Sequence, residues 1–149
     1  MTAPRLQVAV TDGRGRRKLA GGLPRWLADV APAAATGVLV LAIVGDRKMQ
    51  DLNFRFRGVD RVTDVLSFSA GPGASLGGRA PTVFLGDIVI ASGLAARQAR
   101  AAGLTERQEW RRLALHGLLH LLGYDHERDT GQMRRLERRL QRRGGLPLD

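Results

Sequence analysis

The chain has 149 residues, of which 44% are hydrophobic and 26% charged, the composition of a folded globular protein rather than a disordered one. It contains no cysteine, which excludes disulfide bonds and thiolate metal sites. We expect a single domain over residues 1–149, because this length supports one hydrophobic core but not two.

Basic residues greatly outnumber acidic ones. The 24 Lys and Arg residues stand against 14 Asp and Glu residues, which leaves a net charge of +10, and all the basic residues except Lys18 and Lys48 are arginine. Such a charge favours a polyanionic partner, although a basic proteome or simple solubility would also account for it.

Neither a signal peptide nor a membrane span is expected. The first ten residues, MTAPRLQVAV, lack a continuous apolar stretch, and the longest apolar run, GVLVLAIVG, is too short to cross a bilayer. These features predict a cytoplasmic protein with no membrane partner.

The first half of the chain predicts two strands and two helices. Residues 6–10 and 38–44 predict strands, and the second of these is apolar on both faces, as in a strand buried between two layers. Pro24 is suited to the first turn of a helix between them. Asp46 is expected to cap a second helix that ends near Arg57, with an apolar stripe formed by Met49, Leu52 and Phe56.

Two further strands are predicted at residues 62–68 and 83–91, separated by a Gly/Pro/Ser-rich stretch that predicts a mobile loop without regular structure. Three polar residues interrupt these apolar strands. Because buried polar groups need partners, hydrogen bonds that tether loops or sheet are favoured over direct catalysis for them. They are Asp64, Ser67 and Asp87.

The second half of the chain predicts three helices. One begins at Ser92 and ends near Gly103, and the next begins with a Thr105–Gln108 capping box and runs to Leu122. The last covers residues 130–143, with a buried stripe of Met133, Leu136 and Leu140. Strands interleaved with helices predict a compact α/β or α+β domain.

All three histidines of the chain lie in the segment ALHGLLHLLGYDHERD, residues 114–129. His116 and His120 are four residues apart, so on a helix both rings project from one face and can bind one metal ion. Gly123 can adopt the left-handed conformation that ends helices, which would let the chain turn back and bring His126 to the same ion. This arrangement favours a metal site over histidines packed in a core.

Three imidazole ligands leave a tetrahedral zinc ion with one open position, which is typical of a catalytic site. A structural zinc would need a fourth protein ligand, preferably a cysteine thiolate, and the chain has no cysteine. Asp125 could supply a fourth ligand, or it could accept a hydrogen bond from one of the imidazoles. Nickel, copper and cobalt also bind such a ligand set, so the native metal is left open.

The spacing H-x-x-x-H-x-x-G-x-x-H is shared with metzincin proteases, which carry a glutamate as general base directly after the first histidine. Here that position is Gly117, which can neither accept nor donate a proton. A metallopeptidase is therefore disfavoured.

The segment HGLLHLLGYDHERD (116–129) resembles the signature of the YbeY family of bacterial metal-dependent endoribonucleases and rRNA maturation factors. The segments LNFRFRGVDRVTDVLSFS (52–69) and LGDIVIA (85–91) match the family in the same order. One departure is Ser69, where the family often has proline after LSF, and it affects the expected loop conformation but no ligand.

The resemblance implies an α/β fold with a small mixed four-stranded sheet surrounded by helices. It also implies a zinc ion held by His116, His120 and His126 at the end of a core helix. The implied activity is single-strand-specific RNA cleavage in 16S rRNA 3′-end maturation, ribosome quality control and late 30S assembly. The implied partners are 16S rRNA and the small ribosomal subunit with its proteins. A ribosome assembly factor that binds RNA without cleaving it, with a structural metal, is the alternative.

The functionally important arginine of the family falls on Arg57. A guanidinium group can hold two non-bridging phosphate oxygens while negative charge gathers on them during cleavage. A metal can polarise a phosphoryl oxygen or activate water. The sequence leaves open whether the attacking nucleophile is that water or the ribose 2′-hydroxyl.

The segment RRLERRLQRR (134–143) places six arginines around the buried stripe of the last helix. A solvated basic face and a dedicated RNA contact explain this pattern equally well. An RNA contact would weaken steeply with added salt, and the absence of aromatic residues in this helix argues against base stacking there. The RNA-binding candidates are Arg134, Arg135, Arg138 and Arg139.

Overall fold

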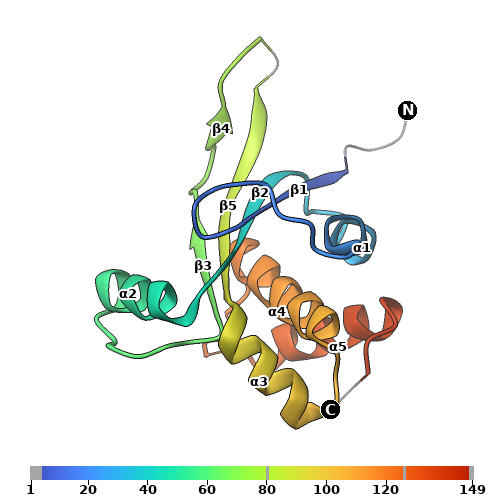
Figure 1. The fold of residues 1–149 in the computed structure, drawn as a ribbon. Helices are drawn as coiled ribbons and strands as arrows, with labels where there is room; N and C mark the ends of the chain where they lie inside the picture. Colours follow the sequence, from blue (N-terminus) through green and yellow to red (C-terminus); the bar gives the residue numbers. More distant parts are fainter. Residues whose placement is uncertain (1–4, 80, 126, 148–149) are drawn as a thin grey trace.

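The computed structural model describes residues 5–79, 81–125 and 127–147, and within these ranges it forms one mixed α/β unit (Figure 1). The strands are β1 (Leu6–Thr11), β2 (Gly37–Val44), β3 (Val65–Ser69), β4 (Ser75–Leu76) and β5 (Thr82–Ala91). The helices are α1 (Leu23–Val30), α2 (Asp46–Arg57), α3 (Ser92–Ala102), α4 (Glu106–Leu121) and α5 (Gln132–Arg143). None of the helices in the described ranges has the length and hydropathy needed to cross a bilayer.

The sheet has the strand order β1-β2-β5-β3. Strands β1, β2 and β5 are parallel, and β3 pairs antiparallel with β5. The predicted mixed sheet of four strands is thus confirmed, with the two-residue strand β4 added. The Gly/Pro/Ser-rich stretch is not wholly irregular, because Ser75 and Leu76 pair with Val83 and Thr82. Gly78, between β4 and β5, has a positive φ of 125°, and the hairpin that these two strands form projects beyond the rest of the molecule (Figure 1).

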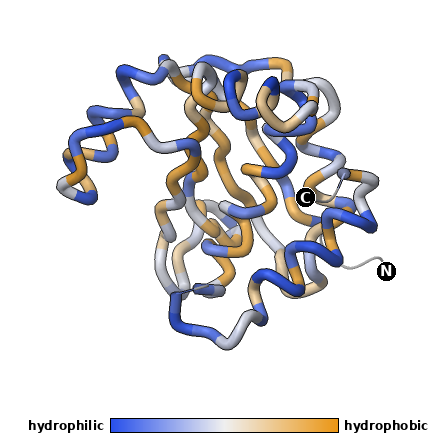
Figure 2. The backbone as a smooth tube through the Cα atoms, turned by 90° about the horizontal axis from the view of Figure 1, so that it is seen from below, coloured by the Kyte–Doolittle hydropathy of each residue, from blue (hydrophilic) through white to orange (hydrophobic). Residues whose placement is uncertain are grey.

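One face of the sheet carries the main hydrophobic core. Alternate residues of β2, namely Leu39, Leu41 and Ile43, point into it, and Ile88 and Ile90 of β5 do the same. Helices α1, α4 and α5 cover this face with buried leucines and a methionine: Leu23, Leu27, Leu113, Leu115, Leu118, Leu119, Met133 and Leu140. Figure 2 shows the hydrophobic strands gathered in the middle of the molecule.

The opposite face of the sheet packs against α2 in a smaller core of Val44, Met49, Leu66, Val89 and Ala91. The predicted stripe of α2 is wrong at one position. Met49 is fully buried, but Phe56 is 64% exposed and meets only the edge of the Phe68 ring, at 5.1 Å between centroids.

Asp46 does not cap the helix that it begins. The residue at the N-cap of α2 is Gly45, and the Asp46 carboxylate instead accepts a hydrogen bond from Leu94 N of α3 at 3.0 Å and pairs with Arg97 at 3.0 Å. Gly93 allows this approach, since a Cβ there would lie 2.6 Å from Asp46 Oδ2. The carboxylate thus caps the first turn of a neighbouring helix rather than its own.

The signals predicted for the other helices are confirmed. Thr105 and Gln108 form the reciprocal capping box of α4, and Gly103 ends α3 at a φ of 72°. The last helix begins at Gln132, two residues later than predicted, with Met133 and Leu140 buried and Leu136 partly buried.

Candidate active site

Helix α4 is the buried element on which the candidate site is built. His116 and His120 are half-buried at its C-terminal end, between leucines that are essentially inaccessible to solvent. Ser67 of β3 donates a hydrogen bond to the carbonyl oxygen of Gly117 at 3.0 Å, which ties the helix to the sheet next to the first histidine. These contacts fix the histidine backbone in place.

Gly117 lies in close contact with the sheet. A Cβ at this position would lie 2.8 Å from Ile88 Cγ2 and 3.0 Å from Ser67 Oγ. A glutamate side chain here would enter the core instead of the cleft. The structure therefore gives a packing reason for the residue that distinguishes this motif from the metzincin pattern.

The two histidine rings are directed at each other. Their Nε2 atoms are 3.1 Å apart, and the ring centroids are separated by 4.7 Å. Two imidazole ligands of one tetrahedral zinc, each about 2.0–2.1 Å from the ion, have nitrogens about 3.3 Å apart. The observed pair of nitrogen donors therefore fits a shared metal ion.

The turn after α4 has the predicted form. Gly123 has a φ of 96°, its N–H donates to the His120 carbonyl at 3.0 Å, and Tyr124 N donates to the Leu119 carbonyl at 3.1 Å. These two bonds form a Schellman motif with glycine at C′. The third predicted ligand, His126, lies outside the described residues. Among the residues that the structure describes, no group of three His, Cys, Asp or Glu side chains is placed to bind a metal.

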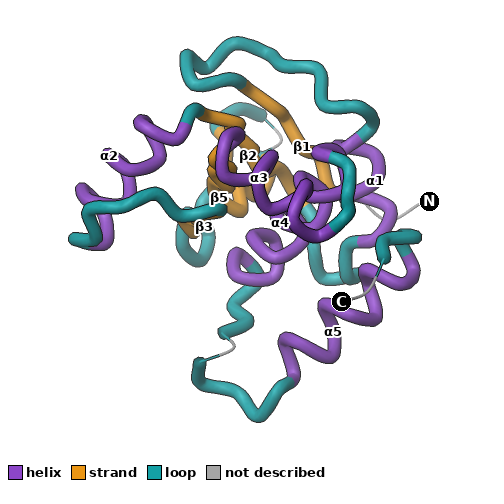
Figure 3. The backbone as a smooth tube through the Cα atoms, turned by 60° about the horizontal axis from the view of Figure 1, so that its bottom comes forward, coloured by secondary structure: helices purple, strands orange, loops and turns teal. Residues whose placement is uncertain are grey.

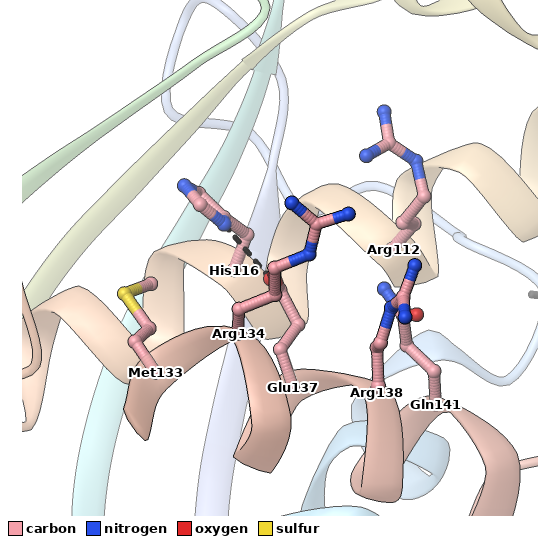
Figure 4. Close-up of a pocket in the computed structure, with 7 residues that line it drawn as sticks. All are labelled: Arg112, His116, Met133, Arg134, Glu137, Arg138 and Gln141. Atoms are coloured by element: carbon pink, nitrogen blue, oxygen red, sulfur yellow. Dashed lines mark hydrogen bonds and ion pairs between the residues drawn. The ribbon is translucent and has the colours of Figure 1, made fainter. Parts of the chain in front are cut away.

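A carboxylate not anticipated from the sequence contacts the first histidine. Glu137 of α5 accepts a hydrogen bond from Nδ1 of His116 at 2.8 Å (Figure 4). The predicted carboxylate, Asp125, uses its oxygens differently: Oδ1 accepts from Glu127 N at 3.0 Å, and Oδ2 lies 3.4 Å from Arg128 Nε. The role proposed for Asp125 stays a prediction, although the residue lines the same cleft as the histidines.

A cleft of about 610 Å³ brings together residues that are distant in the sequence. Arg57 from the end of α2 lines it together with His116 and His120. Its remaining lining is Thr63, Asp64, Val65, Leu66, Ser67, Gly123, Tyr124, Asp125 and Glu127. The structure thus places the predicted phosphate-binding arginine and two predicted metal ligands around one cavity.

Asn53, one helical turn before Arg57 on α2, was not anticipated. Although polar, Asn53 is only 2% exposed, and the hydrogen bond that its amide donates to the Arg61 carbonyl at 2.8 Å offsets the cost of this burial. Its oxygen lies 3.4 Å from Arg57 Nη1, one helical turn away. A polar residue on the buried face of α2 was the available sequence signal.

Two of the three polar residues predicted to interrupt strands do so, Ser67 in β3 and Asp87 in β5, whereas Asp64 directly precedes β3. Asp64 Oδ1 accepts from Val65 N at 2.8 Å, and Ser67 bonds to α4 as described. Asp87 pairs with Phe68 in the β3–β5 register, and burial raises the pKa of its carboxyl above the ordinary value. Ser67 thus tethers β3 to α4, whereas the bond of Asp64 is to its own chain neighbour, and a tethering role for Asp64 stays a prediction.

The candidate RNA-binding arginines of α5 fall into two pairs. Arg134 and Arg138 line a second cavity, of about 330 Å³, on the α5 side of His116 (Figure 4). Arg135 donates to the Thr130 carbonyl at 3.2 Å, and Arg139 is exposed. Of these four arginines, Arg134 and Arg138 are the ones that line a cavity together with His116.

Comparison with known proteins gives a consistent result. The family model described as "Endoribonuclease YbeY" matches residues 21–144. A protein named "Endoribonuclease YbeY" from Solibacter usitatus is 49% identical over 106 residues, covering 70% of this chain and 65% of that protein. One of the same name from Gloeobacter violaceus is 44% identical over 123 residues, covering 81% of this chain and 62% of the relative. The matches thus span less than two thirds of these relatives.

A solved structure has the same fold. The solution structure of TM1509 from Thermotoga maritima superposes with a TM-score of 0.61 at 26% identity and covers 93% of this chain and 88% of that one. The mixed sheet with its surrounding helices is therefore an architecture that has been observed experimentally.

Proposed function

The chain belongs to the YbeY family, and from that premise we propose that it is a metal-dependent endoribonuclease that cleaves single-stranded RNA. The observation that carries the proposal is the cleft in which Arg57 meets the facing Nε2 atoms of His116 and His120. The names of the relatives support an RNA substrate, and the net charge of +10 suits a polyanion.

His116, His120 and His126 are the proposed ligands of one zinc ion. When bound, zinc would polarise a phosphoryl oxygen and lower the pKa of a coordinated water. The donor set fits this ion because two imidazoles already face each other at ligand spacing.

Arg57 is the proposed contact for the scissile phosphate. Its side chain is exposed at the cleft, and its hydrogen bond to Asn53 has the long distance of 3.4 Å, so the guanidinium is available to a phosphate. A guanidinium placed there neutralises charge that develops on the non-bridging oxygens.

The wider role that we propose follows the family. The RNA would be 16S rRNA, processed at its 3′ end, with contributions to ribosome quality control and late 30S assembly in the cytoplasm. The basic face of α5, including Arg134, Arg135, Arg138 and Arg139, would contact the RNA backbone or the small ribosomal subunit.

The proposal is tested with an end-labelled single-stranded RNA that contains the 3′ region of 16S rRNA. We expect the zinc-loaded protein to cleave it, and we expect its duplex form to be spared. Removal of the metal by a chelator should abolish cleavage, and added zinc should restore it. His120→Ala should abolish both zinc binding and cleavage while leaving the circular dichroism spectrum unchanged.

Two outcomes would contradict the proposal. Cleavage that survives both the chelator and His120→Ala would be due to another nuclease. RNA binding with zinc bound but no cleavage by any preparation would instead favour the non-catalytic assembly factor.

A further inference from the structure

His116 lies between two cavities. Its Nε2 side faces the cleft with His120 and Arg57, whereas its Nδ1 side faces the cavity between α4 and α5 (Figure 4). That second cavity is lined by Arg112, His116, Met133, Arg134, Glu137, Arg138 and Gln141. Glu137 is the single acidic residue among these seven, and its carboxylate meets the imidazole.

Glu137 is held on the inward face of a helix whose other positions are largely basic. Met133 and Leu140, four residues before it and three after it, are 1% and 2% exposed, so all three side chains point to the same side of α5. The Glu137 side chain itself is 18% exposed. The packing of the helix therefore sets the position of the carboxylate, independently of its bond to His116.

The bond between Glu137 and His116 determines which imidazole nitrogen carries the proton. A carboxylate accepts hydrogen bonds, so at 2.8 Å it favours the proton on Nδ1. In a neutral ring the other nitrogen, Nε2, is then unprotonated and can serve as a metal ligand, and this atom is the one that faces His120. A metal ion requires that form of the ligand.

We infer that Glu137 is a positioning residue for the metal site: it holds His116 in the Nδ1–H tautomer with Nε2 directed at the ion. The inference rests on the proposed metal site. It assigns Glu137 to ligand orientation and metal affinity, and assigns it no contact with the substrate.

The first test uses metal-free protein. Long-range proton–nitrogen NMR correlations distinguish the two tautomers of a neutral imidazole, and the chain has only 3 histidines to assign. We expect His116 to carry its proton on Nδ1 in the wild type and to lose this preference in Glu137→Leu. A wild-type His116 protonated on Nε2 would overturn the inference.

The second test measures zinc affinity by competition with a chelator of known affinity. Loss of a carboxylate that orients a metal-bound histidine lowers affinity by about 10–100-fold. We expect the loss of zinc affinity in Glu137→Leu to lie near the upper end of that range. Glu137→Gln, which keeps an acceptor oxygen but not the charge, should lie near the lower end. Glu106→Gln makes the same change of charge on the exposed first turn of α4 and should bind zinc as the wild type does.

The variants separate positioning from a purely structural role. If both Glu137 variants unfold at lower temperature without zinc but bind zinc with wild-type affinity when folded, the residue merely docks α5 and the inference fails. If Glu137→Leu does not fold, Glu137→Gln decides by the same two measurements. If RNA is left uncleaved while the tautomer and zinc results come out as expected, the proposed function fails and the assignment of Glu137 stands.

Discussion

Helices α4 and α2 carry the two halves of the candidate site in very different surroundings. Helix α4 crosses the main core, and Leu115, Leu118 and Leu119 on it are fully buried around the histidines. Helix α2 lies at the periphery (Figures 1 and 3), and its last turns are largely solvent-exposed, with Phe54 56% and Phe56 64% accessible.

The difference matches the demands of the two proposed tasks. Metal ligands need positions fixed to a few tenths of an ångström, which a helix embedded in the main core provides. A phosphate contact tolerates more movement, because a long side chain can follow its charged partner. Asn53 is the exception on α2, since this buried amide anchors the end of the helix to the Arg61 backbone.

Among changes that leave the histidines intact, the largest loss of cleavage activity is expected when the arginine on α2 is removed. Arg57→Ala should lower kcat/KM for RNA by about 10²–10³-fold, the usual cost of losing one donor to developing negative charge. Its zinc affinity should stay unchanged because α4 is untouched. Arg55→Ala, which removes an exposed arginine paired with Asp51 on the same helix, is the matched control and should retain activity. Equal losses in the two variants would mean that only the overall charge of α2 matters.

On α4, a change in packing next to the histidines is expected to lower the stability of the protein. Gly117→Ala forces a methyl group against Ile88 and Ser67, and such overpacking costs about 1–3 kcal/mol of unfolding free energy. Urea denaturation measures this loss. Gly77→Ala adds a methyl group where no atom lies within 4 Å, and it should change stability by less than about 0.5 kcal/mol. If Gly117→Ala left the unfolding free energy unchanged, α4 would pack less tightly against the sheet than described.

Asn53→Ala should weaken the anchor of α2. The Arg61 carbonyl and Arg57 each lose a partner, and the expected cost is about 1 kcal/mol of unfolding free energy. We also expect a raised KM for RNA with zinc affinity unaffected. If zinc affinity fell as well, the two halves of the site would be coupled, contrary to the comparison above.

The smallest expected effect is a pH dependence of the protein's stability, caused by Asp87 on the α2 side of the sheet. Burial raises the folded-state pKa of Asp87 above its ordinary value of 3.8, so its contribution to stability is full below that pH and is lost as pH rises through the folded-state pKa. Asp87→Asn should remove this loss and be slightly more stable than the wild type at neutral pH. Denaturant midpoints at about pH 3.5, 5 and 7 for both proteins isolate the difference. If Asp87→Asn were less stable than the wild type at neutral pH, this prediction would be wrong.

Local sequence signals predicted the α4 half well. The i, i+4 histidine pair, the Thr105–Gln108 capping box and the glycine turn at Gly123 each depend on residues within one or two helical turns, and the structure confirms all three features. Local rules were sufficient because neighbouring residues supply the partners.

The features that escaped prediction depend on contacts between distant segments. Glu137 meets His116 only after α5 folds back on α4, and Asp46 serves α3 rather than its own helix. Phe56 kept the helical spacing of a core residue, but α2 extends past the sheet there and leaves it exposed. Helical periodicity identifies a face of a helix, but it does not say how far the neighbouring element extends.

X-ray absorption spectroscopy of the zinc-loaded protein tests the central claim most directly, because it measures metal content and ligand type together. The account predicts one zinc per chain, bound by three imidazole nitrogens at about 2.0–2.1 Å, and no bound zinc in His120→Ala. Zinc that binds in less than stoichiometric amount, or whose spectrum lacks imidazole scattering, would contradict it.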